Sequence, residues 1–271
     1  MTPALAEDAL RDFHSKGWLW LRGLVPAEDT DRMCDQLWAF LARRGVDRQD
    51  PMTWKEASVR GTKKLRFDDH RSPDEFALLR GTLEELFAPH RPEAVPYWGR
   101  VLLTLPDPDG QWHVPHESWH FDHPYRRPGE ILGVNVFLLL AELEPGGGGT
   151  CLLEGSPALA DRMLERVGPC ATLSEQSDAF RSVHPWIEGL KTRERDAERD
   201  ARYLSPATPI DGVRARIVEI TGAAGDVLIT HPALFHALAA NTSAAPRLMR
   251  TLQIRAASSN AANQRNGTPA R

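Results

Sequence analysis

The chain has 271 residues, of which 41% are hydrophobic and 26% charged, and its formal net charge is −4. These proportions are typical of a folded globular protein, and the negative charge argues against general binding to nucleic acids. The longest apolar run, residues 132–141, is too short to span a bilayer. We therefore expect an enzyme-sized protein that has neither nucleic acid nor a membrane as its partner.

The cysteines and the N-terminus predict where the protein works. Cys34, Cys151 and Cys170 form no C-x-x-C motif, and an odd number of scattered cysteines is typical of a reducing compartment. The first eight residues carry acidic side chains and lack the basic start of a signal peptide. Both observations predict a cytoplasmic location.

The first 95 residues are predicted to form a helical region that supports the rest of a single domain. A helix over residues 4–14 ends at Gly17 and precedes a strand over residues 18–22. Apolar residues at helical spacing after Pro26 predict a second helix that ends at Gly45. Two short helices are expected at residues 73–79 and 83–87.

The pattern changes near Trp98, where short apolar segments begin to alternate with turns rich in Gly, Pro and Asp. This spacing predicts a β-sandwich or barrel over residues 96–256. The predicted strands are residues 100–105, 131–141, 150–153, 215–220, 226–230 and 248–256. Residues 157–167 and 174–203 are expected to be helical, as parts of an insert over residues 157–205, and residues 257–271 to be a loose tail.

A candidate metal site lies in the segment Trp119-His120-Phe121-Asp122. In a strand, side chains at positions i and i+2 point to the same face, so His120 and Asp122 would project together. A distant histidine would complete the two-histidine, one-carboxylate set that binds Fe(II) in non-haem oxygenases. Two histidines that follow the Gly225-Asp226 turn, His231 and His236, are the candidates for this third ligand.

The order of several short motifs resembles the phytanoyl-CoA dioxygenase-like branch of the Fe(II)/2-oxoglutarate oxygenases, over roughly residues 10–255. The matching residues are Trp119 to Asp122, Gly148-Gly149-Thr150, Gly155-Ser156, Gly225-Asp226, and His236 with Asn241, Ser243 and Arg247. Residues 17–24 also look like the opening of the family. The resemblance implies a mainly β fold, a double-stranded β-helix of the jelly-roll or cupin-like type, with helices packed outside.

By this resemblance, His120, Asp122 and His236 bind Fe(II), and the spacing of His236 to Arg247 favours it over His231. Arg247 would hold the distal carboxylate of 2-oxoglutarate, because a planar guanidinium can donate two hydrogen bonds to a carboxylate. The family often has a serine two residues after the distal histidine, where this chain has Leu238. Thr104 is our candidate for supplying the missing contact to the cosubstrate.

The resemblance also implies a reaction in which O2 is the oxidant and succinate and CO2 are the co-products. Because Asp122 is present, no ligand position is left for a halide, which favours hydroxylation of an unactivated C–H over halogenation. Desaturation, ring closure and epimerisation stay open. We expect a small-molecule substrate, in specialised metabolism, and the candidates for contacting it are His113, His116, Tyr125 and Arg127. Arg126, Arg127, Arg181 and Lys191 could favour an anionic substrate, although exposed charge is the commoner explanation.

Residues 116–120 offer a rival motif, His-Glu-x-x-His, which is typical of zinc peptidases. That motif requires a continuous helix with both histidines on one face. Pro115 and Pro124 leave room for at most about two helical turns, which disfavours a zinc-dependent hydrolase. A non-catalytic jelly-roll binding protein is the second alternative.

Overall fold

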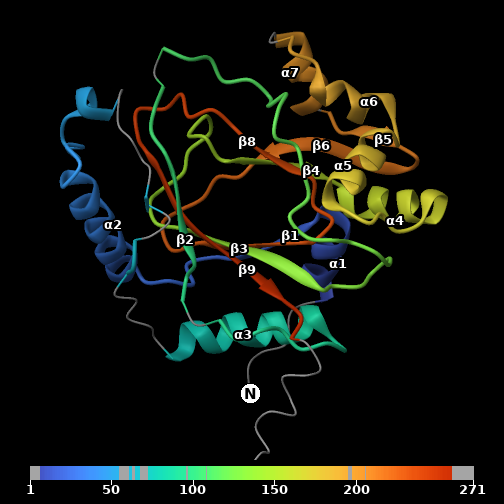
Figure 1. The fold of residues 1–271 in the computed structure, drawn as a ribbon, viewed down its shortest axis with the longest axis horizontal. Coiled ribbons are helices and arrows are strands. Elements are labelled where there is room, and N and C mark those ends of the chain that lie inside the picture. Colours follow the sequence, from blue (N-terminus) through green and yellow to red (C-terminus); the bar gives the residue numbers. More distant parts are fainter. Residues whose placement is uncertain are drawn as a thin grey trace, which may run out of the picture.

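Two antiparallel sheets form the centre of the fold (Figure 1). This computed structural model describes residues 7–54, 61–62, 65–67, 73–95, 97–107, 109–194, 197–204 and 206–257. The larger sheet has the strand order β1-β7-β3-β9-β2, and the smaller sheet has the order β5-β6-β4-β8. Strands that are distant in the chain are therefore neighbours in both sheets, as in a jelly roll.

The strands are β1 (Trp18–Leu21), β2 (Arg100–Thr104), β3 (Gly133–Leu139), β4 (Thr150–Glu154), β5 (Thr208–Ile210), β6 (Val213–Glu219), β7 (Val227–Thr230), β8 (His236–Leu238) and β9 (Arg247–Arg255). The helices are α1 (Glu7–Lys16), α2 (Ala27–Ala42), α3 (Pro73–Phe87), α4 (Ser156–Val167), α5 (Leu173–Arg181), α6 (Pro185–Glu188) and α7 (Ala197–Leu204). Short 3₁₀ turns occupy Pro51–Trp54 and Gly189–Lys191.

Alternation along β3 explains how the larger sheet is buried on both faces. Val136 lies in one apolar cluster with Leu37 of α2 and Leu83 of α3, so these helices cover the outer face. Phe137 points the other way, into a cluster that includes Leu152 of β4 in the smaller sheet. The space between the sheets is therefore a packed interior, and each face of β3 serves a different layer.

The helical insert covers the outer face of the smaller sheet. Leu153 of β4 and Ile217 of β6 share a buried cluster with Leu159 of α4 and Phe180 of α5. In Figure 1, helices α4 to α7 gather on the side of the molecule where β4, β5 and β6 lie. Helices thus cover both sheets from outside, in the arrangement that the sequence predicts.

Several predicted boundaries are wrong. Within the described residues two antiparallel sheets of the cupin-like fold are accompanied by more helix than the predicted mainly β composition implies. Residues 174–203 form three helices, because Pro185 and Gly189 interrupt the pattern, whereas residues 73–87 form the single helix α3 despite Gly81. Strands β5 and β8 were not predicted, because three residues carry too little periodicity. The proposed tail lies outside the described residues after residue 257.

The Gly225-Asp226 turn fastens the N-terminal region to the larger sheet. The carboxylate of Asp226 accepts hydrogen bonds from the Arg22 guanidinium at 2.6 Å and from the backbone N–H of Gly23 at 2.8 Å. Burial opposes ionisation of Asp226, but these hydrogen bonds outweigh it and hold its pKa below the ordinary value. Gly225 has a φ of +86°, and a Cβ there would lie 2.1 Å from the carbonyl oxygen of Val25. Only glycine fits this turn.

Among the described residues, no helix combines the length and the apolar character needed to cross a bilayer.

Candidate metal centre

His120, Asp122 and His236 lie together, with one ligand atom from each within 4.8 Å of the others. The Nε2 atom of His120 is 3.4 Å from one oxygen of Asp122, and the Nε2 atom of His236 is 3.3 Å from the other. Neighbouring ligands about 2.1 Å from a metal ion are separated by roughly 3.0 Å in octahedral geometry. The three side chains therefore fit one face of a metal coordination sphere.

Backbone pairing brings these distant residues together. His120 and His236 form an antiparallel bridge, with N–H···O distances of 3.0 and 3.1 Å in the two directions. Their imidazole centroids lie 4.4 Å apart. His236 begins β8, which pairs with β4 through Leu152. The third ligand is therefore fixed by the smaller sheet, and His120 joins it at the sheet's edge.

Each imidazole is oriented through its Nδ1 atom. The Nδ1 of His120 lies 2.5 Å from the carbonyl oxygen of Ser118, and the Nδ1 of His236 lies 3.0 Å from that of Leu234. A carbonyl can only accept a hydrogen bond, so Nδ1 carries the proton and Nε2 keeps its lone pair. Both histidines thus present the atom that binds a metal ion.

Asp122 is held ionised by its neighbours. Burial opposes its charge, but the hydrogen bonds that the imidazoles of His120 and His236 donate when their Nε2 atoms are protonated outweigh burial and hold its pKa below the ordinary value. The same contact raises the pKa of His120. A bound metal ion would take the place of these Nε2 protons. Asn135 of β3 also donates its amide to Asp122 at 2.6 Å. This donor set of two neutral imidazoles and one carboxylate suits Fe(II).

Sequence reasoning missed Asn135, which is 2% exposed. Its amide oxygen accepts a hydrogen bond from Nε2 of His123 at 3.1 Å, while its NH₂ group binds Asp122. Gly133, two residues earlier, leaves room for the His123 ring, because a Cβ there would lie 2.2 Å from Nδ1. The available signal was one polar residue within an otherwise apolar strand, since a buried amide needs partners.

Arg247 lies at the start of β9 and is 4% exposed. Its Nη1 donates to the carbonyl of Gly148 at 2.6 Å, while its buried Nε has no hydrogen-bond partner among the described residues. Burial lowers its pKa to about 10, against the opposing effect of Glu219. A buried guanidinium with an unused donor favours an anionic ligand.

Strand register relates Arg247 to the other proposed cosubstrate contacts. Thr104 is the partner of Arg247 in the β2–β9 pairing, so the two side chains share a face. Leu238 pairs with Thr150, which follows Gly149 directly. The residues of the predicted cosubstrate site therefore lie around the junction of β9, β4 and β8.

The four predicted substrate residues separate into two pairs. His113 and His116 line a pocket together with Leu238, whereas Tyr125 and Arg127 do not contribute to it. Tyr125 is 2% exposed and donates its hydroxyl to Asp161 at 2.6 Å, so it holds α4 in place. Arg127 is exposed, and its charged partner is Glu130, 4.0 Å away. Closeness in sequence to Asp122 did not predict the direction of these two side chains.

The rival motifs are not supported by the geometry. Residues 116–120 form bends and a β-bridge instead of a helix, and Ser118 has a φ of +64°. His116 contacts Glu117 and is not part of the metal cluster, so the zinc-peptidase interpretation is wrong. The ring of His231 lies against those of Phe13, His14 and Tyr125, and His231 is not part of the metal cluster.

Comparison with known families decides the assignment. The family model described as phytanoyl-CoA dioxygenase (PhyH) matches residues 13–249. The chain belongs to the phytanoyl-CoA dioxygenase family. The match includes His120, Asp122, His236 and Arg247. No curated protein gives a significant match.

Several solved structures are similar to this member of the phytanoyl-CoA dioxygenase family over most of its length, at low sequence identity. EvdO2 from Micromonospora carbonacea var. aurantiaca, complexed with 2-oxoglutarate, is 16% identical, with a TM-score of 0.53 over 95% of this chain and 93% of that one. EctD from S. alaskensis with bound Fe is 17% identical, with a TM-score of 0.50 over 93% and 77%. SnoN, an epimerase from nogalamycin biosynthesis, is 15% identical, with a TM-score of 0.48 over 93% and 83%. At such low identities, the similarity to EvdO2 and EctD shows a shared cupin-like fold and no more.

Proposed function

We propose that this protein is an Fe(II)- and 2-oxoglutarate-dependent dioxygenase that hydroxylates an unactivated C–H of a small molecule. The observation that carries the proposal is the His120, Asp122 and His236 set, with Nε2–oxygen distances of 3.3 and 3.4 Å. Three protein ligands on one face leave three positions of an octahedral ion for cosubstrate and O2. Membership of the phytanoyl-CoA dioxygenase family supports it.

The protein residues would prepare the centre before any chemistry. The backbone carbonyls that hold Nδ1 of each histidine leave both Nε2 atoms ready to bind, and Asn135 orients the Asp122 carboxylate. Arg247 would bind the distal carboxylate of 2-oxoglutarate through its unpartnered Nε–H. When bound, the iron supplies the oxidising chemistry that couples decarboxylation of 2-oxoglutarate to attack on the C–H.

Asp122 favours hydroxylation among the possible outcomes. A halogenating centre needs a position on the metal for halide, and the ionised Asp122 carboxylate would fill that position here. Among the similar structures with a TM-score of at least 0.5, EvdO2 is solved with 2-oxoglutarate and EctD with Fe, which agrees with both proposed components. Specialised metabolism is the setting we propose, and the free cysteines agree with the cytoplasm.

The proposal is tested by succinate formation from 2-oxoglutarate with purified protein, Fe(II) and O2. We expect turnover that stops when a chelator removes the metal. His236→Ala and Asp122→Ala should abolish turnover while the chain stays folded, because each removes one of three ligands. Tight zinc binding without 2-oxoglutarate turnover would contradict the dioxygenase, and failure to bind any metal would favour a non-catalytic binding protein.

A further inference from the structure

A pocket of about 220 Å³ adjoins the candidate metal centre. One wall is the segment from Gln111 to Ser118, and Leu238 lies on the other side. Because His120 pairs with His236 in an antiparallel bridge, Ser118 comes opposite Leu238, each two residues from a proposed ligand. The Leu238 side chain is 51% exposed although its strand is otherwise buried. Exposed apolar surface beside a metal centre is typical of a ligand site.

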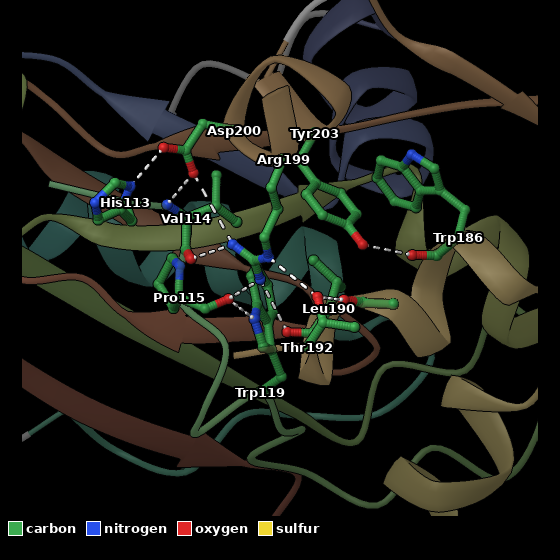
Figure 2. Close-up of polar contacts among 11 residues, drawn as sticks. His113, Val114, Pro115, Trp119, Trp186, Leu190, Thr192, Arg199, Asp200 and Tyr203 are labelled. Atoms are coloured by element: carbon green, nitrogen blue, oxygen red, sulfur yellow. Dashed lines mark hydrogen bonds and ion pairs between the residues drawn. The ribbon is translucent and has the colours of Figure 1, made fainter. Parts of the chain in front are cut away.

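Helix α7 of the insert fixes the pocket wall through Asp200 (Figure 2). One oxygen of its carboxylate accepts from Nδ1 of His113 and the other from the backbone N–H of Val114, both at 2.8 Å. Since a carboxylate only accepts, the neutral ring of His113 carries its proton on Nδ1 and leaves Nε2 as an acceptor. Figure 2 shows that the opposite edge of the ring points away from Asp200.

Arg199, the neighbour of Asp200, binds the same segment from behind. Its guanidinium is 2% exposed and donates to the carbonyl oxygens of Val114 at 2.6 Å and Pro115 at 3.2 Å (Figure 2). It also donates to Leu190 at 3.0 Å, within the insert. A buried cation that bonds several carbonyls fixes their relative positions. The wall that bears His113 is therefore held by two adjacent residues of α7.

The charge of the pocket disfavours an anionic substrate. Its lining includes Glu117 and contains neither lysine nor arginine. Two of the basic residues considered from the sequence contact other groups, Arg181 with Asp178 and the carbonyl of Trp119, and Lys191 with Glu188. Val114, Pro115 and Leu238 add apolar surface. The pocket thus offers a substrate an apolar surface and the Nε2 atom of His113 as an oriented hydrogen-bond acceptor, and its lining has no lysine or arginine.

We infer that His113 is a substrate-binding residue, oriented by Asp200 and Arg199, and that it selects small molecules that carry a hydroxyl or amino donor next to an apolar group. Nε2 of His113 accepts from that donor, and the apolar part of the substrate lies against Leu238. This inference rests on the proposed function, because it places the selected molecule beside the candidate metal centre. Arg199 and Asp200 act through His113 and are positioning residues.

The test measures the binding of three matched probes to the full chain by saturation-transfer NMR. Cyclohexylmethanol and cyclohexanecarboxamide are neutral and carry a donor, whereas methyl cyclohexanecarboxylate is neutral, has the same ring and carries no donor. The chain is used without added metal and with Zn(II), a diamagnetic ion that histidine and carboxylate also bind. We expect the alcohol and the amide to bind about three- to tenfold more tightly than the ester, as for one hydrogen bond.

Four variants separate recognition from folding. His113→Phe keeps an aromatic ring without nitrogens and should abolish the preference for donors. Asp200→Asn should weaken the preference, because an amide can turn and reverse the orientation of the proton on His113. Arg199→Lys should do the same, and Arg202→Lys, an exposed position on α7, is the matched control that should keep the full preference. A purely structural role would lower the melting temperature without changing the ratio of probe affinities.

Equal binding of all three probes, or a preference that survives His113→Phe, would overturn the inference. If Arg199→Lys fails to fold, Asp200→Asn decides whether α7 orients His113, and an unchanged preference in it would overturn that part. A chain with the preference but no succinate formation contradicts the proposed function and supports the pocket assignment. Succinate formation without the preference overturns the pocket assignment alone.

Discussion

Asn135 is the buried residue that connects the larger sheet to the candidate metal centre. Its two hydrogen bonds, to Asp122 and from His123, hold the carboxylate at a fixed angle to both imidazoles. The three proposed ligands were predicted from an ordered set of short motifs that resembles those of a known family. Sequence analysis could not identify Asn135, whose role depends on β3 lying beside a segment that is not its neighbour in a sheet.

Replacing Asn135 with alanine should weaken Fe(II) binding about 10- to 100-fold, the usual loss when a residue that orients a ligand is removed. Anaerobic metal titration measures this change. Val136→Ala is the matched control on the same strand, because Val136 packs with the outer helices and its loss should cost stability alone. Equal metal affinities for Asn135→Ala and the wild type would contradict the role.

Arg247→Lys should raise the KM for 2-oxoglutarate about 10- to 100-fold, because a charge-assisted hydrogen bond contributes about 1.5–3 kcal/mol and lysine cannot reproduce the planar fork. Succinate formation against 2-oxoglutarate concentration gives the value. Arg250→Lys is the control, since Arg250 lies on the opposite face of β9 and binds the carbonyl of Gly99. A larger effect from Arg250→Lys would contradict our assignment.

His231 should make the fold sensitive to mild acid. Burial lowers its pKa to about 3, whereas the unfolded chain takes up this proton near pH 6.5. Between pH 6.5 and 3 the unfolded state therefore binds more protons than the folded state, so the free energy of unfolding falls as the pH drops through this range. The slope approaches about 1.4 kcal/mol per pH unit. Above pH 6.5 the contribution of His231 to stability does not depend on pH.

Urea unfolding at pH 7, 6 and 5 measures this slope. In the wild type, Nδ1 of His231 accepts a hydrogen bond from the backbone N–H of Ala233. His231→Asn keeps an acceptor for this N–H in its amide oxygen, and asparagine does not titrate in this pH range. We expect the variant to lose less stability than the wild type on going from pH 7 to 5. Parallel losses would show that His231 is not the group responsible.

At the scale of elements, the turns are where the sequence predicted structure well. Glycines and prolines marked the ends of most strands, and the apolar runs gave β3, β4 and β9 nearly complete. The predicted helix over residues 174–203 includes most of α7, but the contacts of Arg199 and Asp200 with the segment after Gln111 were not predicted. The periodicity of a sequence predicts which side of a helix is buried, but it does not predict which distant segment that side contacts.

The Gly225 turn should be one of the least replaceable in the molecule. Gly225→Ala combines a positive φ with a Cβ 2.1 Å from a backbone oxygen, whereas Gly129→Ala has a φ of +72° and nothing within 4 Å. We expect a loss of about 1 kcal/mol for Gly129→Ala from strain alone and a clearly larger loss for Gly225→Ala. Urea unfolding compares them, and equal losses would contradict the close approach.

At the scale of the whole molecule, both sheets contribute residues to the candidate metal centre. The smaller sheet supplies His236, the larger sheet supplies Asn135 and Arg247, and the segment between β2 and β3 supplies His120 and Asp122. The insert on the outside reaches back to the pocket wall through α7. The candidate site forms only when both sheets pack against one another. The proposed ligands could be predicted from motifs in the sequence, but the residues that contact them depend on this packing and could not.

The central claim is that iron binds to His120, Asp122 and His236 with 2-oxoglutarate held by Arg247. Crystals grown anaerobically with Fe(II) and 2-oxoglutarate, measured on both sides of the iron absorption edge, test it directly. We predict one anomalous peak within bonding distance of the three side chains, with the cosubstrate reaching the Arg247 guanidinium. An iron peak between His116 and His120, or none at Asp122, would contradict the account.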